Sequence, residues 1–191
     1  MKLFSIPTGN FKLDGGAMFG VVPKTIWQKD YKADENNLIN LSMRSLLIDT
    51  GNHRILIDTG IGNKQSEKFI SHYYLNGNDT LAGSLEKAGY SLDDITDVIH
   101  THLHFDHCGG SIKKNSDGSF SPTFKNATYY ASERQWNWAM NPNRKEVASF
   151  LTENLVPLRE SGRLQLLKEE GDLFPGVSIR FFNGHTDGMI S

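Results

Sequence analysis

The sequence predicts an α/β or α+β domain in which strands and helices form packed layers. Short apolar runs of strand length are mixed along the chain with segments that begin at helix-capping residues, and such mixing is typical of sheets covered by helices. The length of 191 residues suits a single domain, residues 1–191, with a sizeable core.

The N-terminal region predicts a strand, a loop and a hairpin. Residues 3–6 form the first apolar run, and the glycine-rich segment that follows to Gly20 is expected to be a loop. The apolar runs at residues 42–48 and 54–58 flank Thr50-Gly51-Asn52-His53, so they predict the two strands of a hairpin.

Two helices and a buried strand are predicted next. Residues 64–75 and 81–88 have helical character, and Thr80 and Gly89 bound the second helix as its cap and its stop. Residues 97–101 predict a buried strand that leads into a group of histidines.

The remaining sequence predicts elements of both kinds. Asn115-Ser116-Asp117-Gly118 indicates a surface turn, and residues 128–131 indicate a strand. Ser132 and Gln135 resemble a capping box that begins a helix ending near Met140. The last predicted elements are a helix at residues 144–155, strands at 164–167 and 177–182, and a turn at Phe174-Pro175-Gly176 that joins these strands.

Residues 102–107 carry the strongest functional signal, with the sequence His102-Leu103-His104-Phe105-Asp106-His107. Imidazole nitrogen suits zinc, copper, iron and nickel, and a carboxylate adds an oxygen ligand. Side chains two apart on an extended segment point the same way, so His102 and His104 can bind one metal. Asp106 and His107, past the strand end, can turn towards another, and the spacing therefore predicts a two-metal site.

Four of the seven histidines lie between residues 100 and 107, which disfavours a chance grouping. Three histidines outside the motif, and its neighbour Cys108, have structural interpretations. His53 and His72 are expected to have no ligand role, and His100 to be a buried histidine that donates to a backbone carbonyl. Cys108 is expected to pack in the core, with metal binding as the alternative.

The segment from His102 to Gly110, His-Leu-His-Phe-Asp-His-Cys-Gly-Gly, resembles the signature of the metallo-β-lactamase superfamily. Arg54-Ile55-Leu56-Ile57-Asp58-Thr59-Gly60 is similar to that family's strand ending in Asp-Thr-Gly, and Asn183-Gly184-His185-Thr186 is similar to its later Gly-His-Thr segment. Residues 15–24 resemble, with less specificity, the branch that contains N-acyl homoserine lactonases and methyl-parathion-type hydrolases.

The resemblance implies an αββα sandwich with a dinuclear metal site at one edge of its two sheets. It implies that His102, His104 and His185 bind one metal and that Asp106 and His107 bind the other. Two zinc ions are the default, and other divalent metals are the alternative. Asp106 would be the catalytic residue, orienting a hydroxide shared by the two metals. Family members add a bridging aspartate and a final histidine later in the chain, so we expect this fold to be C-terminally incomplete.

Two further groups of residues are candidates around the site. Asp58 ends a strand at a place where a metal-bound histidine needs a carboxylate partner, and capping of the Thr59-Gly60 turn is the equally weighted alternative. A substrate pocket for an acyl chain is predicted from exposed apolar residues of the N-terminal loop, with packing of that loop as the alternative. These residues are Met18, Phe19, Val21, Val22 and Trp27.

Composition excludes several classes of function. A formal net charge of −2 gives no basic surface for nucleic acid, and a single cysteine excludes an internal disulfide and fits a reducing compartment. No apolar run has the length of a signal-peptide core or of a membrane span. We therefore expect a cytoplasmic protein with a small-molecule substrate and no membrane partner, and a homodimer is one alternative for its assembly.

The leading hypothesis is a dinuclear metal hydrolase that opens lactones such as N-acyl homoserine lactones, which would be a quorum-quenching activity. An organophosphate, phosphodiester or other ester hydrolase of the same fold is the alternative among enzymes. A zinc β-lactamase is disfavoured because the chain shows no export signal. A metal-binding module without catalysis is the alternative from a different class.

Overall fold

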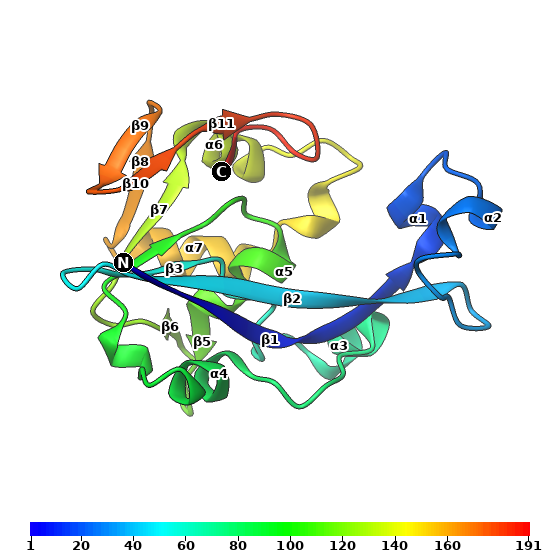
Figure 1. Ribbon diagram of the computed structural model, residues 1–191, viewed down its shortest axis with the longest axis horizontal. Helices are drawn as coiled ribbons and strands as arrows, with labels where there is room; N and C mark the ends of the chain where they lie inside the picture. Colours follow the sequence, from blue (N-terminus) through cyan, green and yellow to red (C-terminus); the bar gives the residue numbers. More distant parts are fainter.

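A six-stranded mixed sheet runs across the molecule (Figure 1). The computed structural model describes all residues 1–191. In sheet order the strands are β1 (Lys2–Asp14), β2 (Leu38–Asp49), β3 (Arg54–Ile57), β4 (Asp97–Ile99), β7 (Thr128–Ser132) and β8 (Leu164–Leu167). Strands β1, β2 and β3 pair antiparallel, whereas β3, β4, β7 and β8 are parallel. The carboxyl ends of these four parallel strands therefore meet at one edge of the sheet.

Three helices cover one face of the sheet and enclose the main core. They are α4 (Leu81–Lys87), α6 (Glu133–Met140) and α7 (Thr152–Glu160). Leu85, Trp136 and Leu158 of these helices pack against Leu56 and Tyr129 of the sheet in one cluster of buried side chains. Removal of this apolar surface from water is the main favourable contribution to folding.

The opposite face of the sheet is covered by two small hairpins. They are β9 (Gly171–Phe174) with β10 (Val177–Ile179), and β11 (Phe181–Phe182) with β12 (Met189–Ile190). Ile55 and Ile99 of the sheet pack against Phe174, Ile179 and Ile190 of these hairpins. The remaining short elements are η1 (Leu92–Asp94), α5 (Phe105–Cys108), η2 (Gly109–Ser111), β5 (Ile112–Lys114), β6 (Phe120–Pro122) and η3 (Val147–Ser149).

The hairpin and the helix that follows it confirm the sequence predictions. Strands β2 and β3 form the predicted hairpin. Helix α4 begins after Thr80, whose side chain accepts a hydrogen bond from the Gly83 N–H, and it is followed by Gly89 at φ +88. The predicted helix at residues 64–75 is shorter, because Ser66 caps the first turn of α3 (Glu67–Tyr73).

The predicted capping box is only half present. Ser132 accepts a hydrogen bond from the Gln135 N–H and so begins α6 as predicted. The side chain of Gln135, however, donates to Thr186 Oγ1 at 3.2 Å and to the Asp187 carbonyl at 2.9 Å. A long-range contact to the last hairpin thus takes the place of the local one.

The predicted loop up to Gly20 is wrong. Strand β1 continues to Asp14, and the Asp14 side chain accepts from the Ala17 N–H and begins α1 (Gly15–Phe19). This helix and α2 (Lys24–Trp27) lie at the tip of the long β1–β2 hairpin, far from the body of the molecule (Figure 1). We call residues 14–37 the arm.

Two other predictions differ from the structure. The helix at 144–155 is wrong: η3 and α7 are separated at Phe150 and Leu151, which are extended, and the Phe150 ring is buried against His104. The strand at 177–182 is interrupted and forms β10 and β11. The turn at residues 174–176 joins β9 to β10, because β8 belongs to the main sheet.

No helix of the chain combines the length and apolar character needed to cross a bilayer.

Candidate metal centre

Three histidines converge just beyond the carboxyl end of β4. His102 and His104 follow that strand, whereas His185 lies in the turn between β11 and β12. Strand β12 is held against this edge because the Ile190 N–H donates to the Thr101 carbonyl at 2.7 Å. One ring nitrogen from each histidine can be chosen so that all three lie within 4.8 Å of one another. The fold therefore joins two segments that are distant in the sequence into one group of histidines that could hold a metal ion.

The two ring nitrogens of His102 and of His104 have different surroundings. His102 Nδ1 lies 3.0 Å from Thr101 Oγ1, and its other nitrogen, Nε2, is buried without any hydrogen-bond partner. His104 Nδ1 lies 3.1 Å from His185 Nε2. A buried polar atom without a partner costs free energy unless a ligand satisfies it, so this donor set fits a bound cation.

Electrostatics keep these rings in the form that binds metals. Burial and the neighbouring His107, His104 and His185 hold the pKa of His102 far below its usual value. Burial and the nearby His185 ring also lower the pKa of His104. Neutral imidazole has the free lone pair that coordination needs, so the site favours the ligating state.

A second group of polar side chains lies against the first. His107 is in helix α5, and its ring centroid is 3.9 Å from that of His102. His107 Nε2 is 3.5 Å from Asp106 Oδ2, so the structure brings this imidazole and this carboxylate together beside the three-histidine set. Burial lowers the pKa of His107, but its hydrogen bond and charge interaction with Asp58 raise the pKa by a larger amount. The pKa of His107 is therefore above its usual value.

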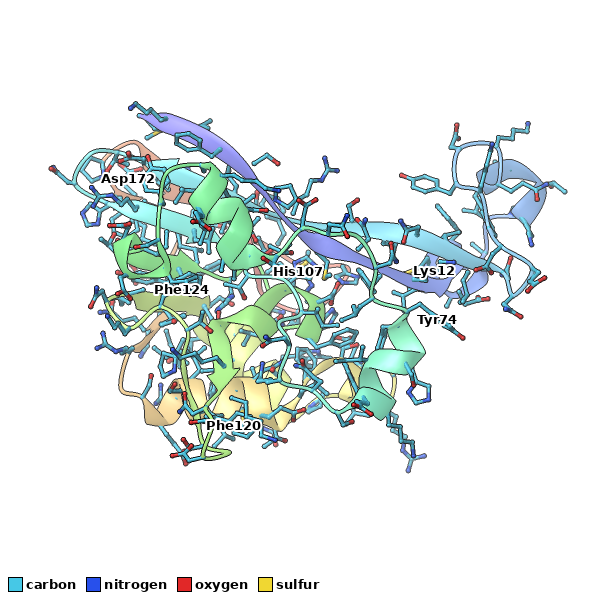
Figure 2. The ribbon with its side chains drawn as sticks, turned by 90° about the horizontal axis from the view of Figure 1, so that it is seen from below. Lys12, Tyr74, His107, Phe120, Phe124 and Asp172 are labelled. Carbon is cyan, nitrogen blue, oxygen red and sulfur yellow. The ribbon has the colours of Figure 1, made fainter.

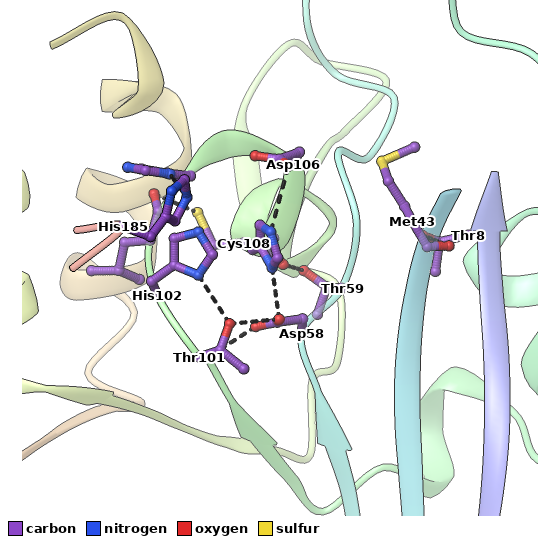
Figure 3. A network of polar contacts seen from close by, with 12 residues as sticks. Thr8, Met43, Asp58, Thr59, Thr101, His102, Asp106, Cys108 and His185 are labelled. Atoms are coloured by element: carbon purple, nitrogen blue, oxygen red, sulfur yellow. Dashed lines mark hydrogen bonds and ion pairs between the residues drawn. The ribbon is translucent and has the colours of Figure 1, made fainter. Parts of the chain in front are cut away.

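Asp58 connects the ends of β3 and β4 beneath the two groups (Figure 3). Its carboxylate lies 2.8 Å from His107 Nδ1, and it accepts hydrogen bonds from the Thr101 N–H at 2.8 Å and the Thr101 hydroxyl at 2.7 Å. Asp58 adopts a positive φ of 59°, a conformation that aspartate tolerates better than most residues. None of these bonds goes to Thr59 or Gly60, so the contacts are those of an imidazole partner and not of a turn cap.

The two neighbouring candidates with structural roles lie outside the ligand set. His100 is fully buried and pairs through Nε2 with the Ser111 hydroxyl at 3.1 Å, where the sequence had predicted a backbone carbonyl as its partner. Burial lowers the pKa of His100 to about 4. The Cys108 thiol is buried in the main core and donates to the Leu103 carbonyl, and burial raises its pKa to about 12. His53 pairs with Asp97, and His72 is exposed on α3.

Glu146 is a residue of this site that the sequence analysis missed. Its Oε2 atom lies 3.6 Å from His104 Nε2 and accepts hydrogen bonds from Thr186 Oγ1 and Trp138 Nε1. Although burial raises its pKa, the bonds from Thr186 and Trp138 lower it more, so its pKa lies below the usual value. No motif surrounds Glu146, and 42 positions separate it from His104, so the sequence carried no signal for it.

The sequence that carries these motifs matches the model of a known protein family. A family model described as the metallo-beta-lactamase superfamily matches residues 44–188. This range contains every histidine, carboxylate and hydroxyl of the centre described above. The chain belongs to the metallo-β-lactamase superfamily.

Individual members of the metallo-β-lactamase superfamily are similar over nearly the whole chain. An N-acyl homoserine lactonase of Bacillus cereus is 26% identical over 203 residues, which cover 100% of this chain and 68% of the relative. A solved structure from Staphylococcus aureus, a probable metal-dependent hydrolase, has 32% identity and a TM-score of 0.89, covering 99% of this chain and 66% of that one. The dizinc quorum-quenching lactonase AidC, in complex with the product N-hexanoyl-L-homoserine, has 24% identity and a TM-score of 0.75, covering 98% of this chain and 65% of that one.

These metallo-β-lactamase neighbours confirm the predicted fold type. This chain spans about two thirds of the length of each of the three proteins. The similarity to AidC lies below 25% identity, so it speaks for the fold alone.

The residues predicted to line a substrate pocket lie in the arm, outside the range of residues 44–188 that the family model matches. Trp27 is buried within the arm, where its ring stacks on Phe19 with centroids 4.9 Å apart. Met18, Val21 and Val22 are exposed on the arm, and Val21 is completely so. In Figure 2 the arm lies beyond Lys12, well away from His107. Within one chain, the structure does not bring these five residues to the metal centre, and their role as a pocket stays a prediction.

Proposed function

We propose that this protein is a metal-dependent hydrolase that opens lactones, with N-acyl homoserine lactones as its substrate class. The observation that carries the proposal is the set of three imidazoles whose ring nitrogens lie within 4.8 Å of one another. Two of these rings, those of His102 and His104, are held neutral by their surroundings, and the Nε2 atom of His102 is buried without a hydrogen-bond partner. Membership of the superfamily and the lactonase activity named for the Bacillus cereus relative support the choice of reaction.

In this proposal the centre holds two cations. His102, His104 and His185 would hold one, and Asp106 and His107 would hold the other. Imidazole and carboxylate donors suit zinc, and manganese, iron or cobalt are alternatives because the ligand type discriminates weakly among them. Bound there, the cations would supply a lower pKa for water, about 7, and Lewis-acid polarisation of the ester carbonyl.

The side chains of the chain perform the positioning. Asp58 accepts a hydrogen bond from His107 Nδ1–H, which leaves His107 Nε2 free to act as a ligand. The Thr101 hydroxyl, which donates to Asp58, keeps His102 Nδ1 engaged in the same way. Asp106 would orient the attacking water by accepting a hydrogen bond from it, on the side of His107 that faces away from Asp58. The alkoxide released from a lactone is a weaker base than an amide nitrogen anion, so little further acid catalysis is needed.

The proposal is tested by comparing hydrolysis of N-hexanoyl homoserine lactone and of a phosphotriester, each with zinc and with a chelator. We expect lactone turnover that exceeds phosphotriester turnover and that is lost on chelation, since the nucleophile depends on the cations. Turnover that survives chelation contradicts the proposed function. Phosphotriester turnover in excess of lactone turnover contradicts the substrate class, and zinc binding without turnover of either compound indicates a metal-binding module.

Matched histidine variants serve as the control in the same assay. His104→Ala removes a buried ligand and is expected to lower lactone turnover by at least about 100-fold. His72→Ala removes an exposed imidazole on α3 and is expected to leave turnover unchanged. Equal effects of the two substitutions would show that the three-histidine set is not the centre of the reaction.

A further inference from the structure

One partly buried carboxylate, that of Glu146, contacts both sequence segments that form the three-histidine set. Glu146 Oε2 lies 3.6 Å from His104 Nε2 and accepts from Thr186 Oγ1 at 2.7 Å and from Trp138 Nε1 at 3.0 Å. The side chain of Glu146 is 16% exposed, so water screens these interactions only weakly. Its neighbours therefore come from the motif, from α6 and from the turn that carries His185.

The position of His104 explains why a carboxylate is useful there. Its Nδ1 atom faces His185 Nε2, and its Nε2 atom is buried and lacks a hydrogen-bond partner within normal range. When Nδ1 acts as the ligand, the proton of the ring resides on Nε2. The acid group nearest to that N–H is Glu146, at ion-pair distance.

The contact with Thr186 extends the effect of Glu146 to the next ligand. Thr186 directly follows His185 and is almost fully buried. Its hydroxyl donates to Glu146 Oε2 and accepts from Gln135 Nε2 at 3.2 Å. The backbone beside His185 is thus held by the same carboxylate that faces His104.

Glu146 is itself held in place locally. The Asn143 side chain accepts from the Lys145 and Glu146 N–H groups at 2.9 Å each, which fixes the turn that presents Glu146. On the other side, the Phe150 ring packs against His104 with centroids 4.9 Å apart. The segment 143–150 therefore forms one wall of the centre. Glu146 is not part of the group whose ligand atoms lie within 4.8 Å of one another, so its geometry is that of a partner of the ligands.

We propose that Glu146 is a positioning residue of the metal centre: it accepts the Nε2–H of His104 and fixes Thr186 beside His185, so that both imidazoles stand in the ligating orientation before a cation binds. This inference rests on the proposed function, because it requires a cation at the three-histidine set. A carboxylate partner also makes the imidazole a stronger donor to the metal.

The test measures zinc affinity by competition with a chromophoric chelator, together with the visible spectrum of the cobalt-loaded protein. Glu146→Gln keeps an oxygen that accepts from Thr186 and Trp138 but removes the negative charge. We expect its zinc dissociation constant to rise about 10–100-fold and its cobalt bands to shift, as loss of such a partner typically does. Glu160→Gln removes the same charge from an exposed position at the end of α7 and should change neither measurement.

A further variant and a stability measurement complete the design. Glu146→Asp retains the charge with a shorter reach, so a smaller loss of affinity is expected, and this variant carries the test if Glu146→Gln does not fold. A zinc dissociation constant within about twofold of the parent, with an unchanged cobalt spectrum, overturns the inference. The inference is also overturned if Glu146→Gln lowers the melting temperature of the chelated protein but leaves zinc affinity and the cobalt spectrum unchanged. A parent protein that binds no zinc overturns the proposed function first, which separates the two failures.

Discussion

Lys64 is an ammonium group buried beside the loop that follows the metal motif. The residue is 8% exposed, and its Nζ atom donates to the carbonyl of Gly109. Burial lowers the pKa of Lys64 to about 8 from its ordinary value of 10.5. Between pH 8 and 10.5 the folded state therefore holds Lys64 mainly as the neutral amine, whereas the unfolded chain keeps it protonated.

This difference predicts a pH-dependent stability. Between pH 8 and 10.5 the unfolded chain binds more protons than the folded one, so the free energy of unfolding rises with pH across this window. We expect the parent to gain on the order of 3 kcal/mol relative to Lys64→Met as the pH increases over this range. Urea unfolding at several pH values measures the difference, with Lys68→Met, at an exposed position of α3, as the matched control. A parent-minus-variant difference that stays constant would show that Lys64 is solvated.

How well each residue of the centre could be predicted depends on how close it lies to the others in the sequence. His102, His104, Asp106 and His107 lie within six positions, and their types and spacing alone pointed to metal binding. Asp58 was a candidate with two interpretations, because a strand-ending aspartate serves equally well as a turn cap. Glu146 was not predicted, since nothing local distinguishes it from any exposed glutamate.

The backbone at Gly109 and Gly110, directly after the metal motif, packs closely against the backbone of residues 59–61. A Cβ added at Gly109 would overlap the carbonyl oxygen of Ile61, and one added at Gly110 would overlap that of Thr59. Gly109 has ordinary helical dihedral angles, so the requirement for glycine there is purely steric. The segment 59–61 is thereby pressed against the segment that carries Asp106 and His107.

Alanine substitutions separate this steric effect from backbone strain. Gly109→Ala is expected to cost about 3 kcal/mol of stability, because backbone atoms would have to move, and to weaken metal binding as well. Gly118, in the exposed β5–β6 turn, has φ +85 and open space on the side where a Cβ would lie, so Gly118→Ala should cost about 1–2 kcal/mol through strain alone. Urea unfolding and zinc titration of both variants test this. Equal costs, or unaltered zinc affinity in Gly109→Ala, would disprove the steric account.

Element boundaries were predictable where local chemistry sets them. The side chains of Thr80 and Ser132 accept the N–H bonds that begin α4 and α6, and both starts were predicted. The helix predicted at 144–155 failed because burial of Phe150 against His104 requires extended backbone at that point. Helical propensity is a weak preference, and a tertiary contact outweighs it.

For the molecule as a whole, the arm is a separate packing unit. Its interior is Trp27, which stacks on Phe19 and occupies the space next to Gly15. Its connection to the body is the two-stranded ribbon of β1 and β2, which is visible in Figure 1. A unit with so few contacts to the body should open without disturbing the main core.

Removal of the Trp27 ring tests this independence. Trp27→Ala is expected to cost about 3–5 kcal/mol within the arm, as for other buried aromatic residues, and to make residues 14–37 sensitive to protease. Zinc affinity of the three-histidine set should remain within about threefold of the parent, because no arm residue contacts it. Val21→Ala, at a fully exposed position, is the control and should change neither property. Loss of zinc affinity in Trp27→Ala would show that the arm supports the centre.

The sequence by itself determined the type of fold, the hairpin, the caps of α4 and α6 and the cluster of three histidines and one aspartate at residues 102–107. These features depend on side-chain spacing and on hydrogen bonds between near neighbours in the chain, and both can be read from a short stretch of residues. The family resemblance implied that His185 lies with His104, whereas only the tertiary structure decided that Asp58 faces His107, that Glu146 contacts His104 and Thr186, and that the arm stands apart. Each of these depends on the order of strands in the sheet and on which surfaces pack together, and packing free energy is shared among residues too distant in sequence to leave a local pattern.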